Sequence, residues 1–297
     1  MSNFVEKDSM PVSGSTKVFA LFGDPVTHSL SPVMQNRAFR ALGLDCCYVP
    51  FHVCSGELAA AVAAVRALNL GGVNLTIPHK EQILAYLDEV DQEALLIGAV
   101  NTIVNRNGFL CGYNTDASGF LASLLSLGFD PLGKRAVILG AGGAARAVSF
   151  ALAGRGVSQI DICNRSLEKA EHLARDLTKG TKVDVRVRDL STSFMKVLQD
   201  AELLVNTTPV GMYPHHQVKP LVMKEELHPG LLVCDLVYNP IQTRLLEEAA
   251  LVGCSVLSGV GMLAHQGAFA FQLWTGREAP VDLMQDVVEE ALRNISE

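Results

Sequence analysis

Features typical of membrane and secreted proteins are missing from this sequence. One of its longest apolar runs, residues 58–65, falls well short of the roughly 18 apolar residues that span a bilayer. The first residues are polar and contain no apolar stretch of a secretory signal, so we expect residues 1–17 to form a flexible tail. These absences predict a soluble, cytoplasmic protein with no membrane partner.

Signatures of metal and nucleic-acid binding are also missing. The 7 cysteines include no C-x-x-C pair, and the 8 histidines show no H-E-x-x-H or similar ligand spacing. We therefore expect reduced thiols and no metal site. Lys and Arg number 24 against 31 Asp and Glu, a formal net charge of −7, so we expect no nucleic-acid partner.

The chain is long and apolar enough to form a folded core, and strand-like and helix-like segments alternate along it. Its 297 residues, 49% of them hydrophobic, suffice for two domains, with one large α/β domain as the alternative. Short apolar runs alternate with segments of helical period, which is typical of βαβ units around a parallel sheet. The predicted fold class is therefore α/β.

The predicted strands and helices follow this alternation. Strands are expected at residues 18–23, 46–52, 72–76, 100–105, 108–112, 135–140, 159–163, 183–187, 203–206, 231–236 and 255–257. Helices are expected at residues 33–42, 57–68, 80–87, 116–127, 144–153, 167–177, 243–252, 262–274 and 281–294. Asn107-Gly108 predicts a turn between the strands expected at 100–105 and 108–112. A turn-rich stretch at residues 128–133 predicts a domain boundary, and the last two helices could belong to either domain.

A glycine-rich motif follows the strand predicted at 135–140. It matches G-x-G-x-x-A at the start of a helix and consists of Gly140, Ala141, Gly142, Gly143, Ala144 and Ala145. Gly140 permits a tight turn, Gly142 lets the backbone approach a pyrophosphate, and Ala145 allows close packing of helix on strand. The motif predicts a dinucleotide site, and the alternative is a glycine-rich turn with a structural role alone.

The end of the next predicted strand indicates which dinucleotide binds. NAD sites usually place an acidic residue there, whereas this chain has Asn164-Arg165-Ser166, followed by Lys169. The guanidinium of Arg165 can form two hydrogen bonds with a 2′-phosphate. The sequence therefore favours NADP, unless Arg165 is an ordinary surface charge.

Polar residues also gather where the earlier strands end. Ser29 and Ser31 precede a predicted helix and could bind an anion, or Ser31 could be the helix N-cap alone. Lys80 begins another predicted helix, where the helix dipole disfavours a cation, and Asp116 begins a third. The two could form a proton-transfer pair, or they could be a surface lysine and a helix N-cap.

A series of short motifs in this order resembles the shikimate dehydrogenase family. The motifs are residues 23–32, 74–80, 98–102, 112–116, 140–146, 164–166, 206–212, 235–240 and 259–266. Together the resemblance covers about residues 18–280. It implies reversible, NADP-dependent reduction of 3-dehydroshikimate to shikimate by an oxidoreductase acting on a CH–OH group, in the chorismate pathway of aromatic amino acid biosynthesis.

The same resemblance implies a domain organisation and roles for single residues. Residues 18–117 and 259–297 would form an α/β substrate-binding catalytic domain and residues 118–258 an NADP-binding Rossmann domain, in a monomer or homodimer. Lys80 and Asp116 would be catalytic. The substrate would be held by Ser29, Ser31, Asn74, Thr76, Asn101, Asp116, Tyr238 and Gln266. The cofactor would be surrounded by Gly140, Ala141, Gly142, Gly143, Ala144, Ala145, Asn164, Arg165, Ser166, Lys169, Thr207, Met212, Leu236 and Gly259.

Two other functions stay open. After Ser31-Pro32 the commonest family pattern has His-Asn, whereas this chain has Met34-Gln35-Asn36, which resembles the branch that also oxidises quinate. A quinate/shikimate dehydrogenase with broader substrate and NAD use is therefore one alternative. The other is a non-catalytic dinucleotide-binding sensor, which we would expect to lack Lys80 or Asp116, whereas both are present.

Overall fold

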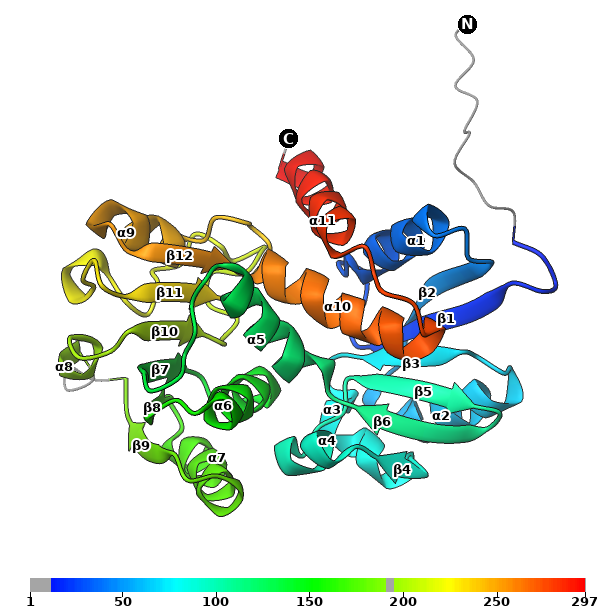
Figure 1. The fold of residues 1–297 in the computed structure, drawn as a ribbon, viewed down its shortest axis with the longest axis horizontal. Coiled ribbons are helices and arrows are strands. Elements are labelled where there is room, and N and C mark those ends of the chain that lie inside the picture. Colours follow the sequence, from blue (N-terminus) through cyan, green and yellow to red (C-terminus); the bar gives the residue numbers. More distant parts are fainter. Residues whose placement is uncertain (1–11, 191–194, 297) are drawn as a thin grey trace, which may run out of the picture.

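Two six-stranded sheets, joined by long helices, make up the protein in a computed structural model (Figure 1). The structure describes residues 12–190 and 195–296. The first sheet has the strand order β2-β1-β3-β5-β6-β4, and the second has the order β12-β11-β10-β7-β8-β9. The predicted two-domain α/β fold with a Rossmann-type parallel sheet is confirmed.

The first sheet combines parallel and antiparallel pairing. Its strands are β1 (Lys17–Gly23), β2 (Cys46–His52), β3 (Gly72–Leu75), β4 (Glu89–Val90), β5 (Thr102–Arg106) and β6 (Phe109–Tyr113). β1 runs parallel to β2 and β3, whereas β5 is antiparallel to β3 and β6. Asn107 and Gly108, the predicted turn between β5 and β6, have φ angles of 55° and 93°, as a type I′ hairpin requires.

Short helical segments connect the strands of the first sheet. They are α1 (Ser31–Ala41), the 3₁₀ turn η1 (Ser55–Glu57), α2 (Leu58–Ala67), α3 (His79–Gln82), the 3₁₀ turn η2 (Ile83–Tyr86) and α4 (Gln92–Ile97). The single helix predicted at 80–87 is therefore wrong, because α3 ends at Gln82 and a 3₁₀ turn follows. β4 and α4 were not predicted, since elements of 2 and 6 residues are too short to show a period.

The second sheet is parallel throughout. Its strands are β7 (Arg135–Leu139), β8 (Gln159–Cys163), β9 (Asp184–Arg188), β10 (Leu203–Asn206), β11 (Leu232–Asp235) and β12 (Ser255–Ser258). The helical segments between them are α6 (Gly143–Arg155), α7 (Leu167–Gly180), α8 (Met195–Leu198), η3 (Lys224–Glu226) and α9 (Arg244–Val252).

Both faces of the second sheet are buried. Ala136 and Ile138 of β7 pack in one hydrophobic cluster with residues of α6, and Val137 and Leu139 pack in another with residues of α9. This explains why the strand reads as a continuous apolar run. The strand order reverses between β7 and β10, and in sheets of this order a ligand binds outside the carboxyl ends of the strands at that point.

Two helices lie side by side between the sheets, α5 (Thr115–Ser126) and α10 (Gly259–Thr275) (Figure 1). A Cβ atom on Gly119 of α5 would lie 2.6 Å from the backbone nitrogen of Gln266 in α10, so the helices can approach this closely only at a glycine. Near the end of α10, Trp274 donates a hydrogen bond from Nε1 to the Ile103 carbonyl of β5 at 2.9 Å, and α11 (Val281–Ser296) packs on α1. The helix α10 therefore contacts the first sheet directly, and α11 contacts the helix that connects β1 and β2.

The predicted N-terminal tail is shorter than expected. Residues 1–11 of that prediction lie outside the described residues, and Lys17 already belongs to β1. The Ser15 and Thr16 hydroxyls donate hydrogen bonds to the Asp45 carboxylate at 2.8 and 2.7 Å, so the tail prediction is wrong for these residues. In the described part of the chain, no helix has the combined length and apolarity needed to cross a membrane.

Candidate active site

A cavity of about 280 Å³ lies where the carboxyl ends of strands from both sheets meet α10. Every residue predicted to bind substrate or to catalyse lines it, namely Ser29, Ser31, Asn74, Thr76, Lys80, Asn101, Asp116, Tyr238 and Gln266. Three residues predicted to contact the cofactor, Ala144, Leu236 and Gly259, line it as well. The fold thus brings together side chains that are separated by more than half of the chain.

Lys80 and Asp116 form an ion pair inside this cavity. The Lys80 Nζ lies 2.6 Å from Asp116 Oδ2, and the two side chains are 24% and 9% exposed. The other carboxylate oxygen, Oδ1, accepts a hydrogen bond from Asn101 Nδ2 at 2.9 Å. A carboxylate held on both oxygens in this way has a fixed orientation, and it offsets the unfavourable position of a cation in the first turn of α3.

Asp116 is not the N-cap of its helix. Asn114 takes that place, because its Oδ1 accepts hydrogen bonds from the backbone nitrogens of Asp116 and Ala117 at 3.1 and 3.3 Å. The structural alternative for Asp116 is therefore wrong, and its carboxylate remains available to Lys80.

A buried chain of hydrogen bonds continues from Asn101 away from Lys80. Thr102 donates from Oγ1 to Asn101 Oδ1 at 3.0 Å, and Asn74 Nδ2 donates to Thr102 Oγ1 at 2.9 Å. Asn101 Oδ1 also accepts the backbone N–H of Thr115 at 2.7 Å, which connects the start of α5 to the residue before β5. Both amides are at most 5% exposed, so their donors and acceptors are oriented before any ligand arrives.

Tyr48 completes this chain and was missed by the sequence analysis. It is 2% exposed, and its hydroxyl donates to Asn74 Oδ1 at 2.8 Å. Burial raises the pKa of Tyr48, and a hydrogen bond with the Ser31 side chain opposes that shift. A tyrosine within a predicted strand gives no sign of a role at a site, because Asn74 is 26 positions away and only the pairing of β1 with β2 and β3 brings the two together.

We expect Tyr48→Phe to raise the KM for shikimate, the substrate that the family resemblance implies, about fivefold or more, while the KM for the cofactor stays unchanged. The ring would remain packed on Trp274, but the buried Asn74 oxygen would lose its donor, at a cost of about 1–3 kcal/mol, and 1 kcal/mol corresponds to roughly fivefold. Steady-state kinetics checks this, with Tyr86→Phe at an exposed tyrosine as the matched control. An unchanged KM in Tyr48→Phe would contradict the role.

Ser29 and Ser31 approach the cavity at the start of α1. Ser31 is the first residue of the helix, and Leu30 before it is the N-cap without a side-chain hydrogen bond, so Ser31 is not the N-cap. The Ser31 backbone nitrogen donates to Ser29 Oγ at 3.3 Å. Two hydroxyls and the N-terminus of an 11-residue helix thus face one end of the cavity, an arrangement that suits a carboxylate.

The residues at 34–36, which suggested activity on quinate, do not line the cavity. Gln35 is fully buried and donates from Nε2 to the Gly267 carbonyl at 2.9 Å. Asn36 donates from Nδ2 to the Tyr48 carbonyl and accepts the Tyr48 backbone N–H. These side chains hold α1 against α10 and β2, so they do not contact a ligand in the cavity.

The glycine-rich motif forms a tight turn at the end of β7. Gly140 has a φ of +113°, and a Cβ there would lie 2.5 Å from Thr207 Oγ1, which donates to the Leu139 carbonyl at 2.6 Å. A Cβ on Gly142 or Gly143 would meet no atom within 4 Å, so the N-terminus of α6 is open on that side. Ala145 is fully buried against the sheet. An exposed, side-chain-free helix N-terminus fits a pyrophosphate.

The other predicted cofactor residues lie around the same edge of the second sheet. Asn164 donates from Nδ2 to the Ser166 carbonyl at 2.8 Å, which shapes the loop between β8 and α7. Arg165 and Lys169 are exposed on that loop and the following helix turn. Gly259 begins α10, where a Cβ would lie 2.3 Å from the Leu236 carbonyl, and Met212 is 47% exposed. Ala141, between Gly140 and Gly142, is partly exposed.

This geometry defines a class of protein, the two-domain dehydrogenases that use a dinucleotide. Known sequence families match three parts of the chain: the shikimate dehydrogenase substrate binding domain at residues 21–103, the shikimate/quinate 5-dehydrogenase family at residues 125–237, and the shikimate 5′-dehydrogenase C-terminal domain at residues 259–289. The chain belongs to the shikimate dehydrogenase family, as its sequence predicted.

Individual relatives are similar along nearly their whole length. The shikimate dehydrogenase (NADP(+)) of Methanopyrus kandleri is 50% identical over 96% of this chain and 99% of its own. That of Moorella thermoacetica is 52% identical, covering 95% of both chains. The crystal structure of shikimate 5-dehydrogenase from Thermus thermophilus in complex with NADP(H) and shikimate is 42% identical, with a TM-score of 0.84, and covers 93% of this chain and 100% of that one.

Proposed function

We propose that this chain is a shikimate dehydrogenase that catalyses the reversible, NADP-dependent reduction of 3-dehydroshikimate to shikimate in aromatic amino acid biosynthesis. The observation that carries the proposal is the Lys80–Asp116 pair, held in a cavity that residues of the Rossmann sheet also line. The relatives named above, which carry this activity and cofactor in their names, support it.

The reaction requires a hydride to move at a ring carbon and a proton to move at its oxygen. NADP supplies or accepts the hydride when it is bound. Lys80 Nζ and the Asp116 carboxylate act on the proton: in the oxidation of shikimate the pair takes the hydroxyl proton, and in the reverse direction Lys80 returns it to the carbonyl oxygen. The hydrogen bond from Asn101 keeps the carboxylate turned toward Lys80.

The remaining residues of the cavity orient the substrate. Ser29 and Ser31 bind its carboxylate, while Thr76, Asn101 and Gln266 bind its ring hydroxyls. Asn74 and Tyr238 line the same cavity. Fixing a carboxylate at one end and hydroxyls at the other leaves one ring carbon facing the cofactor.

The domain boundaries follow from this assignment. Residues 18–117 and 259–297 form the substrate-binding catalytic domain, and residues 118–258 form the NADP-binding domain. The hydrogen bond from α10 to the Ile103 carbonyl and the packing of α11 on α1 support the return of the C-terminal residues to the first domain. A monomer or homodimer in the cytoplasm is the expected form of the enzyme.

The site gives less support to the two alternative functions. A sensor without activity would not require a partly buried Lys–Asp pair in its cavity. A broader quinate dehydrogenase was suggested by residues 34–36, which do not line the cavity, and the relatives described above are named for NADP rather than NAD. An absorbance assay of nicotinamide reduction, with shikimate and quinate each tested against NADP and NAD, distinguishes the candidates. Activity with shikimate and NADP far above the other three combinations is expected.

We expect Arg165→Ala to weaken NADP binding roughly tenfold or more and to leave NAD binding almost unchanged. We expect the exposed guanidinium to bond the 2′-phosphate, which only NADP carries, and a hydrogen bond to a charged group contributes about 1.5–3 kcal/mol. The measurement is the ratio of KM values, with Arg175→Ala, an exposed arginine on α7, as control. An equal loss for both cofactors would mean that Arg165 shapes the loop instead.

A further inference from the structure

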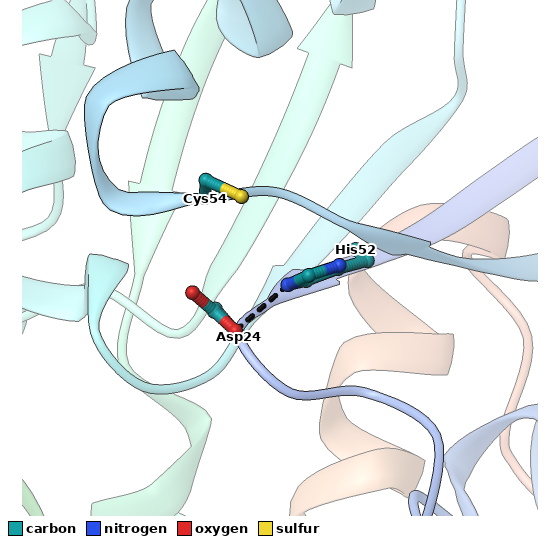
Figure 2. Close-up of side chains that lie close together, drawn as sticks. All are labelled: Asp24, His52 and Cys54. Atoms are coloured by element: carbon teal, nitrogen blue, oxygen red, sulfur yellow. Dashed lines mark hydrogen bonds and ion pairs between the residues drawn. The ribbon is translucent and has the colours of Figure 1, made fainter.

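Three side chains that could bind a metal lie close together at the carboxyl ends of β1 and β2, outside the cavity described above. They are the carboxylate of Asp24, the imidazole of His52 and the thiol of Cys54 (Figure 2). One ligand atom from each lies within 4.8 Å of the other two, and His52 Nε2 lies 2.7 Å from Asp24 Oδ1. All seven cysteines belong to the described part of the chain, and Cys54 alone among them is exposed.

The pairing of strands brings these side chains together. β1 and β2 are parallel, with Gly23 opposite His52, so Asp24 and Cys54 leave the sheet at the same edge. The main chain that carries the three residues is held in place. Asp24 N donates to the Ile77 carbonyl at 2.8 Å, Val53 N to the Gly23 carbonyl at 3.0 Å, and Glu57 N to the Cys54 carbonyl at 2.9 Å. The donors are therefore positioned by the fold and need only side-chain rotation to converge.

We propose that Asp24, His52 and Cys54 bind a divalent transition-metal ion of the zinc and cobalt class. Thiolate, imidazole and carboxylate are the donors that Zn²⁺ takes in proteins, whereas Mg²⁺ and Ca²⁺ prefer oxygen alone. Ligands at about 2.0–2.3 Å from a tetrahedral ion stand roughly 3–4 Å from one another. Here one pair of ligand atoms is 2.7 Å apart, and all three lie within 4.8 Å of one another. The remaining position is open to water, because the His52 and Asp24 side chains are 57% and 41% exposed.

Binding changes the protonation of the cluster in a defined way. The Cys54 thiol loses its proton to solvent, and the sulfur gives an electron pair to the metal. Neutral His52 gives the lone pair of Nε2, with its ring proton on Nδ1, and the hydrogen bond between Nε2 and Asp24 is replaced by two bonds to the ion. The sequence carried no metal motif, because Asp24 lies 28 positions before His52 and only strand pairing joins them.

The cluster lies next to the cavity along the chain, because Asp24 directly precedes residues that line it. Pro25, directly after Asp24, lines the cavity, as do Ser29 and Ser31 of the same segment. An ion on Asp24 would anchor the start of this segment to the end of β2. The proposal itself does not depend on the proposed function, since metal binding can be measured without substrate or cofactor.

Cobalt spectroscopy of the full chain tests the proposal. After treatment with a chelator and its removal, Co²⁺ titration is expected to give a thiolate-to-cobalt charge-transfer band that saturates at one ion per chain and disappears when Zn²⁺ is added. Cys54→Ser and His52→Gln should lose the band. Cys47→Ser, which removes a half-buried thiol from β2, the strand that ends at His52, should keep it. No band in the wild-type protein, or a band that survives in Cys54→Ser, would overturn the proposal.

Thermal unfolding provides a second, independent readout. Zn²⁺ should raise the Tm of the wild-type protein and of Cys47→Ser, because an ion that binds the folded state stabilises it. Loss of an outer-shell partner commonly weakens metal binding 10- to 100-fold, so loss of the Cys54 ligand should raise the Kd for Zn²⁺ by at least about that factor. Equal zinc-dependent shifts in wild-type protein and Cys54→Ser would place the ion elsewhere and refute the assignment.

Discussion

Lys80→Ala is expected to lower kcat by roughly 10²–10⁴-fold with little change in the KM for the cofactor, because that is the usual contribution of a positioned general acid or base. Asp116→Asn should have a similar effect, since the amide can no longer pair with the ammonium group 2.6 Å away. The double variant should lose much less than the product of the two, because the residues act as one unit.

The control for this prediction is another lysine in an ion pair. Lys134 pairs with Glu202 at 2.9 Å on the second sheet, away from the cavity, and Lys134→Ala should leave kcat close to that of the wild type. Steady-state kinetics and circular dichroism on all four variants are the measurements. A Lys80→Ala enzyme with near-normal kcat and only a raised KM would identify Lys80 as a binding residue.

The double substitution of Ser29 and Ser31 by Ala is expected to weaken shikimate binding far more than tenfold. Each hydroxyl would contribute a hydrogen bond to a carboxylate, worth about 1.5–3 kcal/mol, and the cofactor site is not touched. The measurements are the two KM values, with Ser126→Ala on the surface of α5 as the control.

A neutral analogue sharpens this second test. The methyl ester of shikimate lacks the charge that the two serines are proposed to recognise, so the double variant and the wild type should bind it with similar, weak affinity. If the double variant loses as much affinity for the ester as for shikimate, the serines shape the cavity rather than bind the carboxylate.

Much of the fold was accessible from the sequence because its signals are local. The apolar run of β7, the glycine motif and the Asn107-Gly108 turn each lie within a few residues, and the structure has all three where they were predicted. The short elements α3, η2 and β4 carry too few residues to show a period. Their conformation depends on contacts with distant residues, such as the pairing of β4 with β6 and the packing of η2 on α2, which no local pattern reports.

The site residues also differ in whether a local signal in the sequence reveals them. Lys80 was accessible as a cation in an unfavourable position at a helix start, Asp116 was accessible as a carboxylate at the start of another predicted helix, and family motifs added the residues around them. Tyr48 and the Asp24–His52–Cys54 cluster could not be found in this way, because their partners come from strands 26 and 28 positions apart. The side chains within such a cluster have no fixed spacing in the sequence, and only the sheet register defines them.

The close contact of α5 with α10 at Gly119 lies where the chain passes from one sheet to the other. Because these two helices connect the sheets, any rotation of one sheet relative to the other would turn about them. Asp116 lies in the first turn of α5, and Gln266 lies in α10 opposite Gly119, so both lie on the axis of that rotation. Such a rotation would change the distance from the glycine motif to the Lys80–Asp116 pair, and it would also move Tyr238, which follows β11 of the second sheet, relative to the cavity residues that come from the first sheet.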